Sequence, residues 1–218
     1  MLIKQQLLAA LASGLLPIAE AREDIIGFFS QPTRSSGERQ PKAAQSADVD
    51  NAFEANSAFL LWIAEVVAGG RNAAEQCLID ARSISRERSG LFADWLAQWA
   101  RSATLNQAIW HAREEISAAA RRYEQSRCPH GGHAAPTLDE MRELSELPPE
   151  ELVHSLDPFV RTVALMRGVS HSALQDCAIR LGTTRSAVAA ACCEFARWNH
   201  SRMNASRDAA TQGQLLQH

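Results

Sequence analysis

Thiol and imidazole side chains, the ligands that zinc prefers, occur together in residues 128–136, CPHGGHAAP. Cys128, His130 and His133 are the candidate ligands, but their spacing follows none of the common zinc patterns and no fourth ligand is evident. The glycines and prolines around them are typical of a connecting segment. We therefore predict a flexible connector there, and no metal site in the chain.

The other side chains that could do chemistry are not arranged for catalysis. His154, His171 and His200 form no pair at i, i+4 spacing, and isolated helical histidines are usually surface or capping residues. The phosphate-binding patterns GxxxxGK[ST] and GxGxxG are absent, as are the hydrolase patterns HExxH and GxSxG. The sequence therefore predicts a binding protein that uses no cofactor, with a small helical enzyme or metal sensor as an alternative.

The five cysteines are an odd number, and several lie where they would serve as small apolar residues of helices. This usage favours a reducing compartment and predicts a cytoplasmic protein. We interpret the adjacent Cys192 and Cys193 as small core residues, and a redox switch with Cys177 is the alternative.

Residues 176–188, DCAIRLGTTRSAV, predict two short helices hinged at Gly182, which supplies the backbone freedom to end the first helix. Thr184 or Ser186 can cap the second one. This is the shape of a helix-turn-helix, in which the second helix enters the major groove of DNA. An ordinary helical hairpin has the same local pattern, so both interpretations stay open at this point.

The elements that must position these side chains are expected to be helices. Ala, Leu, Arg and Glu dominate, while Gly and Pro cluster between residues 30 and 42 and between 128 and 149. We predict an all-α protein with two small helical domains joined by a flexible linker. Its parts are an N-terminal helix and linker (1–50), a first domain (51–127), a linker (128–145), a second domain (146–203) and a polar tail (204–218). One continuous bundle with Gly182 unbent inside a helix would contradict this organisation.

Helical spacing predicts the core of the first domain. Its two apolar stripes are Leu60, Ile63, Ala64 and Val67, and then Phe92, Trp95, Leu96 and Trp99. We also place Trp110 in the core, because a large aromatic side chain is more often buried than used for base stacking. Trp95→Ala should then cost several kcal/mol of stability.

The N-terminus and the net charge limit the partners that the chain can have. The apolar run 7–18 is too short to span a bilayer, so we expect an amphipathic helix that packs on the body. Ala19-Glu20-Ala21 also fits the cleavage site of a secretory signal, which is the alternative. The formal net charge of -3 provides no general attraction to nucleic acid, so any DNA affinity must be local or supplied by a partner.

Two separated stretches resemble the extracytoplasmic-function sigma factors of RNA polymerase. Residues 73–81, AAEQCLIDA, followed by 92–100, FADWLAQWA, are similar to region 2 of that family, which reads DAEDxxQE and then FxxWLxxIA. Asp157-Pro158, the run 161–163 and the segment 178–188 are similar to region 4, where a helix-turn-helix reads the -35 promoter element. The resemblance covers roughly residues 50 to 200, in the family's order and spacing.

The resemblance implies partners and contact residues. Ala74 and Glu75 match the helix that docks on the largest polymerase subunit, and with the adjacent Gln76 they are the candidate polymerase-binding residues. In the helix that meets the melted -10 strand, the exposed neighbours of the matched residues are the candidate contacts, namely Arg101, Asn106 and Gln107. The candidates for the -35 element are Thr184, Arg185 and Ser186, at the start of the second hinged helix.

The expected function is that of a sigma-like initiation factor with core RNA polymerase and promoter DNA as partners, and an anti-sigma factor is left open. Two departures from the family favour an alternative. Gln76, Ile79 and Arg82 replace the usual residues of the docking helix. The recognition helix offers only Arg185 and Arg197 as cations. The alternative is a degenerate sigma-like module that binds a protein through its alanine-rich last helix and does not bind DNA independently.

Overall fold

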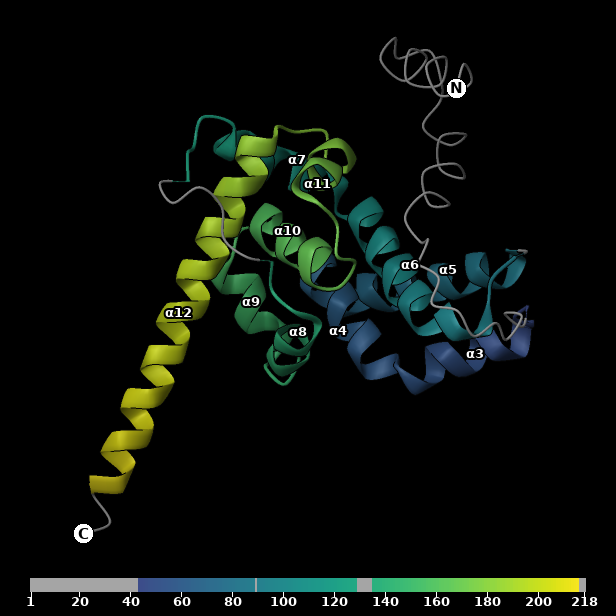
Figure 1. Cartoon of the computed structure of the whole chain (residues 1–218), viewed down its shortest axis with the longest axis horizontal. Coiled ribbons are helices and arrows are strands. Elements are labelled where there is room, and N and C mark those ends of the chain that lie inside the picture. The colour runs from purple at the N-terminus through teal and green to yellow at the C-terminus, as the bar shows by residue number, and fades with distance from the viewer. Residues whose placement is uncertain (1–42, 89, 129–134, 216–218) are drawn as a thin grey trace, which may run out of the picture. The chain divides into compact units, whose positions relative to one another are not determined.

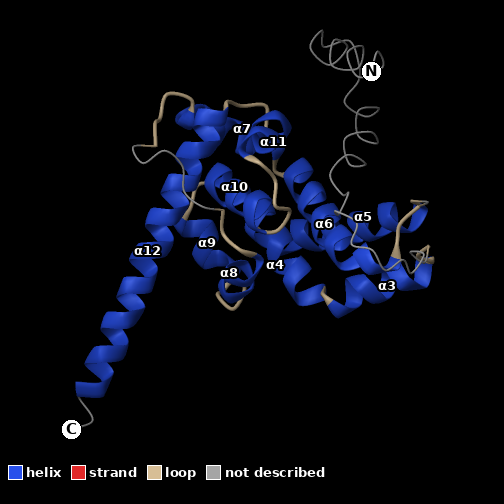
Figure 2. Cartoon of the chain, in the orientation of Figure 1, coloured by secondary structure: helices blue, strands red, loops and turns tan. Residues whose placement is uncertain are grey.

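The computed structural model describes residues 43–88, 90–128 and 135–215, with side chains described as far as 205. In these residues every regular element is a helix, and a single isolated bridge joins Ala43 to Phe92 (Figures 1 and 2). The all-α prediction is therefore confirmed. The expected N-terminal helix lies outside the described residues. None of the described helices is long and apolar enough to cross a membrane.

The first group of helices comprises α3 (Ser46–Ala55), α4 (Ser57–Ala68), α5 (Arg71–Glu87), α6 (Leu96–His111) and α7 (Arg113–Ala120). Helix α3 begins inside the segment that we expected to be linker, and at its start the Gln45 amide donates to the Asp48 carboxylate at 2.9 Å. Helix α4 ends at Gly69, whose φ of 77° lies in the left-handed region that glycine adopts without a Cβ clash.

The second group comprises α8 (Leu138–Leu144), α9 (Pro149–Ser155), α10 (Pro158–Gly168), α11 (Leu174–Arg180) and α12 (Arg185–Leu215). Thr137 and Glu140 form a capping box at the start of α8, where the Glu140 amide donates to Thr137 Oγ1 at 3.1 Å. Asp157 caps α10 by accepting from the amide of Phe159 at 3.0 Å, next to a proline in the first helical turn. The residues after 203 continue α12 as far as Leu215, so the expected polar tail is largely helical.

The two groups of helices share one hydrophobic core. Helix α10 is buried along almost its whole length and packs against α4, α7 and α12, which come from both predicted domains (Figure 1). A helix that is apolar on nearly every side must be covered on every side, and neither group alone provides enough helices to do so. The described residues accordingly belong to one compact unit, 41–218, and not to two domains held apart by a flexible linker.

Two side-chain hydrogen bonds also join the groups. Trp62 of α4 donates from Nε1 to the carbonyl of Leu147, between α8 and α9, at 3.2 Å. Tyr123, in the short 3-10 helix Arg121–Tyr123, donates to Glu194 of α12 at 2.9 Å. The indole N–H and the phenol hydroxyl are thus hydrogen-bonded although their rings are buried, as buried polar groups generally are.

Two of the predicted core tryptophans are on the surface. Trp95 is 37% exposed and Trp110 is 47% exposed. Trp95 lies in the 3-10 helix Ala93–Trp95 before α6, so it does not continue the register of Leu96 and Ala100, which are buried. Leu96 and Ala100 belong to a second, smaller core, which they form with Leu60, Ala81 and two residues of α3, Val49 and Phe53.

Candidate functional site

The turn between α11 and α12 has the predicted hinge. Gly182 has a φ of 62°, and the amide of Thr183 donates back to the carbonyl of Ala178 at 2.9 Å. Thr184 Oγ1 then accepts from the amide of Ala187 at 3.2 Å and so caps α12. Both local features come from residues within a few positions of each other, and both follow the sequence prediction.

The predicted contact residues at the start of α12 are all exposed. Thr184, Arg185 and Ser186 lie on the surface at the N-terminal turn of the helix, where unpaired backbone amides carry a partial positive charge. Beyond this turn α12 is covered, because Ala187, Val188 and several small residues after them are buried against α10 and α11. The surface that α12 offers here is therefore narrow and contains one guanidinium, Arg185.

The predicted contact residues on α6 are largely enclosed. Arg101 is 9% exposed and Gln107 is 7% exposed, so our expectation that they lie on an open face was wrong. Asn106 is half-buried and accepts a hydrogen bond from Arg180 at the end of α11. Helix α10 of the second group also packs on α6, although the sequence analysis placed the two groups in separate domains. The structure thereby links one predicted α6 residue directly to the helix that precedes the hinge.

The predicted docking residues on α5 have different environments. Ala74 is fully buried and serves the core, whereas Glu75 and Gln76 are exposed. Glu75 accepts a hydrogen bond from Arg71 at 2.9 Å, and Gln76 donates one to Asp80 at 2.8 Å. Both are i, i+4 pairs on the exposed surface of α5. Ile79 lies among them and is 61% exposed, which makes it the most prominent apolar group on this helix.

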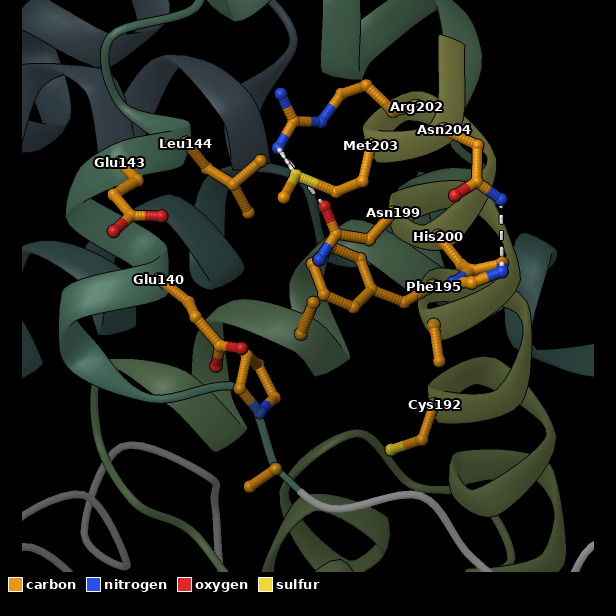
Figure 3. A pocket seen from close by; sticks show the side chains of 14 residues that line it. Glu140, Glu143, Leu144, Cys192, Phe195, Asn199, His200, Arg202, Met203 and Asn204 are labelled. Atoms are coloured by element: carbon orange, nitrogen blue, oxygen red, sulfur yellow. Dashed lines mark hydrogen bonds between the residues drawn. The ribbon is translucent and has the colours of Figure 1, made fainter. Parts of the chain in front are cut away.

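A groove of about 390 Å³ lies between α8 and the middle of α12 (Figure 3). Glu140 and Glu143 of α8 stand on one side, while Asn199, His200 and Met203 of α12 stand on the other. The sequence prediction missed this groove. No local signal could have found it, because its two walls are some sixty residues apart and meet only through tertiary packing.

The structure pairs Cys128 with Cys193 in a disulfide, with the two Cα atoms 6.0 Å apart. This corrects the interpretation of Cys193 as a plain core residue and gives Cys128 a partner outside its own segment. Cys177 and Cys192 stay free, and burial raises the pKa of Cys177 to about 12, which makes it a poor nucleophile. Because disulfides are uncommon in a reducing cytosol, the cysteines no longer indicate that compartment.

Of the three residues that were considered as zinc ligands, only one lies within the described residues. His130 and His133 lie outside the described residues, and Cys128 is in the disulfide. Elsewhere in the described chain, no group of three or more His, Cys, Asp or Glu side chains is placed to hold a metal ion.

Comparison with protein-family models, with curated proteins and with solved structures finds no match to this chain. Its function must therefore be argued from the residues and from their geometry.

Proposed function

We propose that the chain is a sigma-like transcription initiation factor that binds core RNA polymerase and recognises the -10 and -35 elements of a promoter in the cytoplasm. The observation that carries this proposal is the hinged pair α11 and α12. A left-handed Gly182 followed by an exposed helix start with Thr184, Arg185 and Ser186 is the arrangement that a DNA-reading helix-turn-helix requires. The segments that resemble sigma-factor regions 2 and 4 also occur in the family's order along the chain, which supports the proposal further.

Under this proposal the chain must open before α6 can reach a melted DNA strand. The hydrogen bond between Arg180 and Asn106 would break, and α11 and α12 would move away from α6. The free protein is then a closed form, and polymerase binding supplies the free energy of opening. Polymerase would contact the exposed residues of α5, namely Glu75 and Gln76, with Ile79 between the polar pairs.

A second candidate function is that of a sigma-like module that binds a protein partner and has no DNA affinity of its own. The scarcity of cations on α12 favours it, because each phosphate contact needs a donor and Arg185 is alone at the helix start. The two functions differ in whether a complex of the chain with polymerase retains DNA.

The experiment that separates them is capture of core polymerase from the native cell, followed by binding of fragmented genomic DNA over a salt titration. The first function predicts capture, retention of DNA and a steep dependence of retention on salt. Capture with no DNA retention, at any salt, would support the second function. Failure to capture polymerase would refute the first.

Variants of the full chain refine this test. Arg185→Ala should weaken DNA retention and lower the salt slope by about 1, while its free energy of unfolding changes by less than about 0.5 kcal/mol. Arg121→Ala is the matched control, since Arg121 is also exposed but lies away from the start of α12, in the 3-10 helix after α7. Glu75→Lys should reduce polymerase capture and leave folding intact.

A further inference from the structure

The groove between α8 and α12 lies within the second group of helices. Its described lining comes from α8, from the middle of α12, from Ala164 of α10 and from Ala135 and Pro136, which precede α8. None of these residues belongs to α5, to α6 or to the start of α12. Contacts with α6 are therefore not needed to form the groove, and it is separate from the surfaces proposed for polymerase and DNA.

Apolar side chains line the inside of the groove. Leu144 of α8 and Phe195 of α12 are buried there, while Met203 beside them is 42% exposed (Figure 3). Methionine is flexible and adapts its shape to an apolar neighbour. An apolar side chain that enters the groove would remove Met203 from water, which favours binding.

The α8 wall of the groove has an excess of negative charge. Glu140 and Glu143 line it, and Asp139 lies one turn before Glu143 on the same helix. Residues 137–151 contain six acidic side chains, all of them exposed, and a single arginine. None of the six forms an ion pair within the described part of the chain, although Glu140 accepts a hydrogen bond from Thr137. Cations supplied by a partner would therefore meet unpaired carboxylates here.

The α12 wall of the groove has no carboxylate among its described residues. Its polar groups bond to one another: Arg202 donates to Asn199 at 3.2 Å, and the Asn204 amide lies 3.1 Å from the ring nitrogen of His200. Arg202 would repel a cation on this side. The positive groups of a ligand must therefore face α8, which fixes the orientation of the ligand in the groove.

We propose that this groove binds a helix of a partner protein that has apolar residues on one face and Lys or Arg beside them. A groove between two helices receives the side chains of a third helix. The described residues offer no strand edge there, so an extended peptide could not bind by backbone pairing. The carboxylates of α8 select a cationic helix over an anionic one. This inference does not rest on the proposed function, because the groove uses other residues.

The test is fluorescence anisotropy of the full chain with a labelled peptide of about 18 residues, long enough to form a helix. The peptide contains only Leu and Lys, with Leu at helical spacing, and a Leu and Glu peptide of the same pattern is the comparison. We expect saturable binding of the Leu and Lys peptide that weakens as salt is added, and no binding of the other. Absence of binding, or equal binding of both peptides, would overturn the proposal.

Glu143→Lys tests the charged wall. This variant should bind the Leu and Lys peptide about ten-fold more weakly, because an attraction becomes a repulsion. Glu114→Lys is the matched control, since Glu114 is also exposed, lies on α7 and gives the same change of net charge. Equal weakening by the two variants would show that the peptide responds to the net charge of the chain, and would overturn the proposal.

Met203→Ala tests the apolar lining. It should weaken peptide binding about five-fold, whereas Ile84→Ala should leave it unchanged, because Ile84 is similarly exposed but lies on α5. Both variants change exposed side chains, so they should keep the wild-type circular dichroism and melting temperature. An affinity of Met203→Ala equal to that of the wild type would overturn the proposal.

Two further measurements separate this proposal from other interpretations. Sedimentation of the chain alone tests whether a second copy occupies the groove: a dimer that Met203→Ala dissociates would overturn the proposal in favour of self-association. Polymerase capture is measured separately. Peptide binding without polymerase capture would refute the proposed function and leave the groove proposal standing, while capture without peptide binding would do the reverse.

Discussion

At the scale of single residues, Phe159 and Trp95 occupy contrasting environments. Phe159 is fully buried in α10, and its ring lies 5.4 Å from that of Tyr123. Trp95 is 37% exposed and contacts Phe92 edge-on, with the ring centroids 5.3 Å apart. The larger aromatic side chain therefore contributes less to the hydrophobic core than the smaller one.

Truncation of these two side chains should differ in cost. Phe159→Ala leaves a cavity at the centre of the core and should lower the free energy of unfolding by about 3–5 kcal/mol. Trp95→Ala removes a half-exposed ring and one aromatic contact, and should cost about 1–2 kcal/mol. Urea unfolding followed by circular dichroism measures both. Equal costs would show that Trp95 is buried more deeply than the structure has it.

At the scale of elements, two local connections, called joints below, position helices relative to one another: an ion-pair cluster between α3 and α5, and a glycine turn between α11 and α12. Asp50 of α3 accepts hydrogen bonds from Arg82 and Arg86 of α5, each at 2.7 Å. Gly182 forms the joint between α11 and α12 with a φ of 62°, and a Cβ added at this residue would meet no heavy atom within 4 Å. The first joint depends on charge and the second on backbone conformation, so they respond to different changes.

The Asp50 joint should make stability depend on pH in acid. Hydrogen bonds from Arg86 and Arg82 lower the pKa of Asp50 from 3.8 to about 2. A carboxylate with a lowered pKa in the folded state contributes stability fully above the unfolded value, and this contribution is lost as the pH falls from about 4 to about 2. Asp50→Asn should therefore show a smaller loss of stability over that interval in urea unfolding. Asp94→Asn, at an exposed site, is the control, and identical pH profiles for the wild type and Asp50→Asn would contradict the expectation.

The Gly182 joint should be sensitive to any side chain. Gly182→Ala introduces no clash, but it places a Cβ on left-handed backbone, so it should cost about 1–2 kcal/mol of stability. Gly70→Ala is the control, because Gly70 has an extended backbone with φ of -174° and open space around it. Gly70 is also the N-cap of α5, where Ala is less favourable than Gly, so this substitution should cost about 0.5 kcal/mol, less than Gly182→Ala. A neutral Gly182→Ala substitution would mean that the turn can adopt another conformation.

At the scale of the whole molecule, one core and one covalent link hold the two helix groups together. Helix α10 is covered by helices of both groups, and the disulfide ties Cys128, after the first group, to Cys193 in the last helix. The proposed opening for DNA binding would have to separate the groups while this link is intact or after it is reduced. Under the proposed function, the redox state of the disulfide would therefore affect DNA binding.

Reduction of the disulfide should lower stability without unfolding the chain. The bond closes a loop with a sequence separation of 65, and its loss should cost about 2–4 kcal/mol in urea unfolding. The same cost is expected for Cys128→Ser. Thiol titration of the denatured protein checks the pairing directly: three free thiols without reductant and five with it. Five thiols without reductant would show that the bond does not form in solution.

Local features of the fold could be predicted because their causes lie within a few residues. The capping box of Thr137 and Glu140, the Asp157-Pro158 start of α10 and the left-handed Gly182 follow from side chains that bond to nearby backbone. The Thr184 cap at the start of α12 also belongs to this class. The exposure of that helix start depends on which helices pack against α12, so it belongs to the tertiary structure.

The sequence by itself determined that the chain is helical and that it bends at residue 182. Only the tertiary structure decided that helices of both groups share one core, that Arg101 is enclosed, and that Cys128 meets Cys193. The physical reason is range. Capping and turn preferences act over about four residues, whereas burial of α10 and the environment of Arg101 depend on helices that come together from distant parts of the chain.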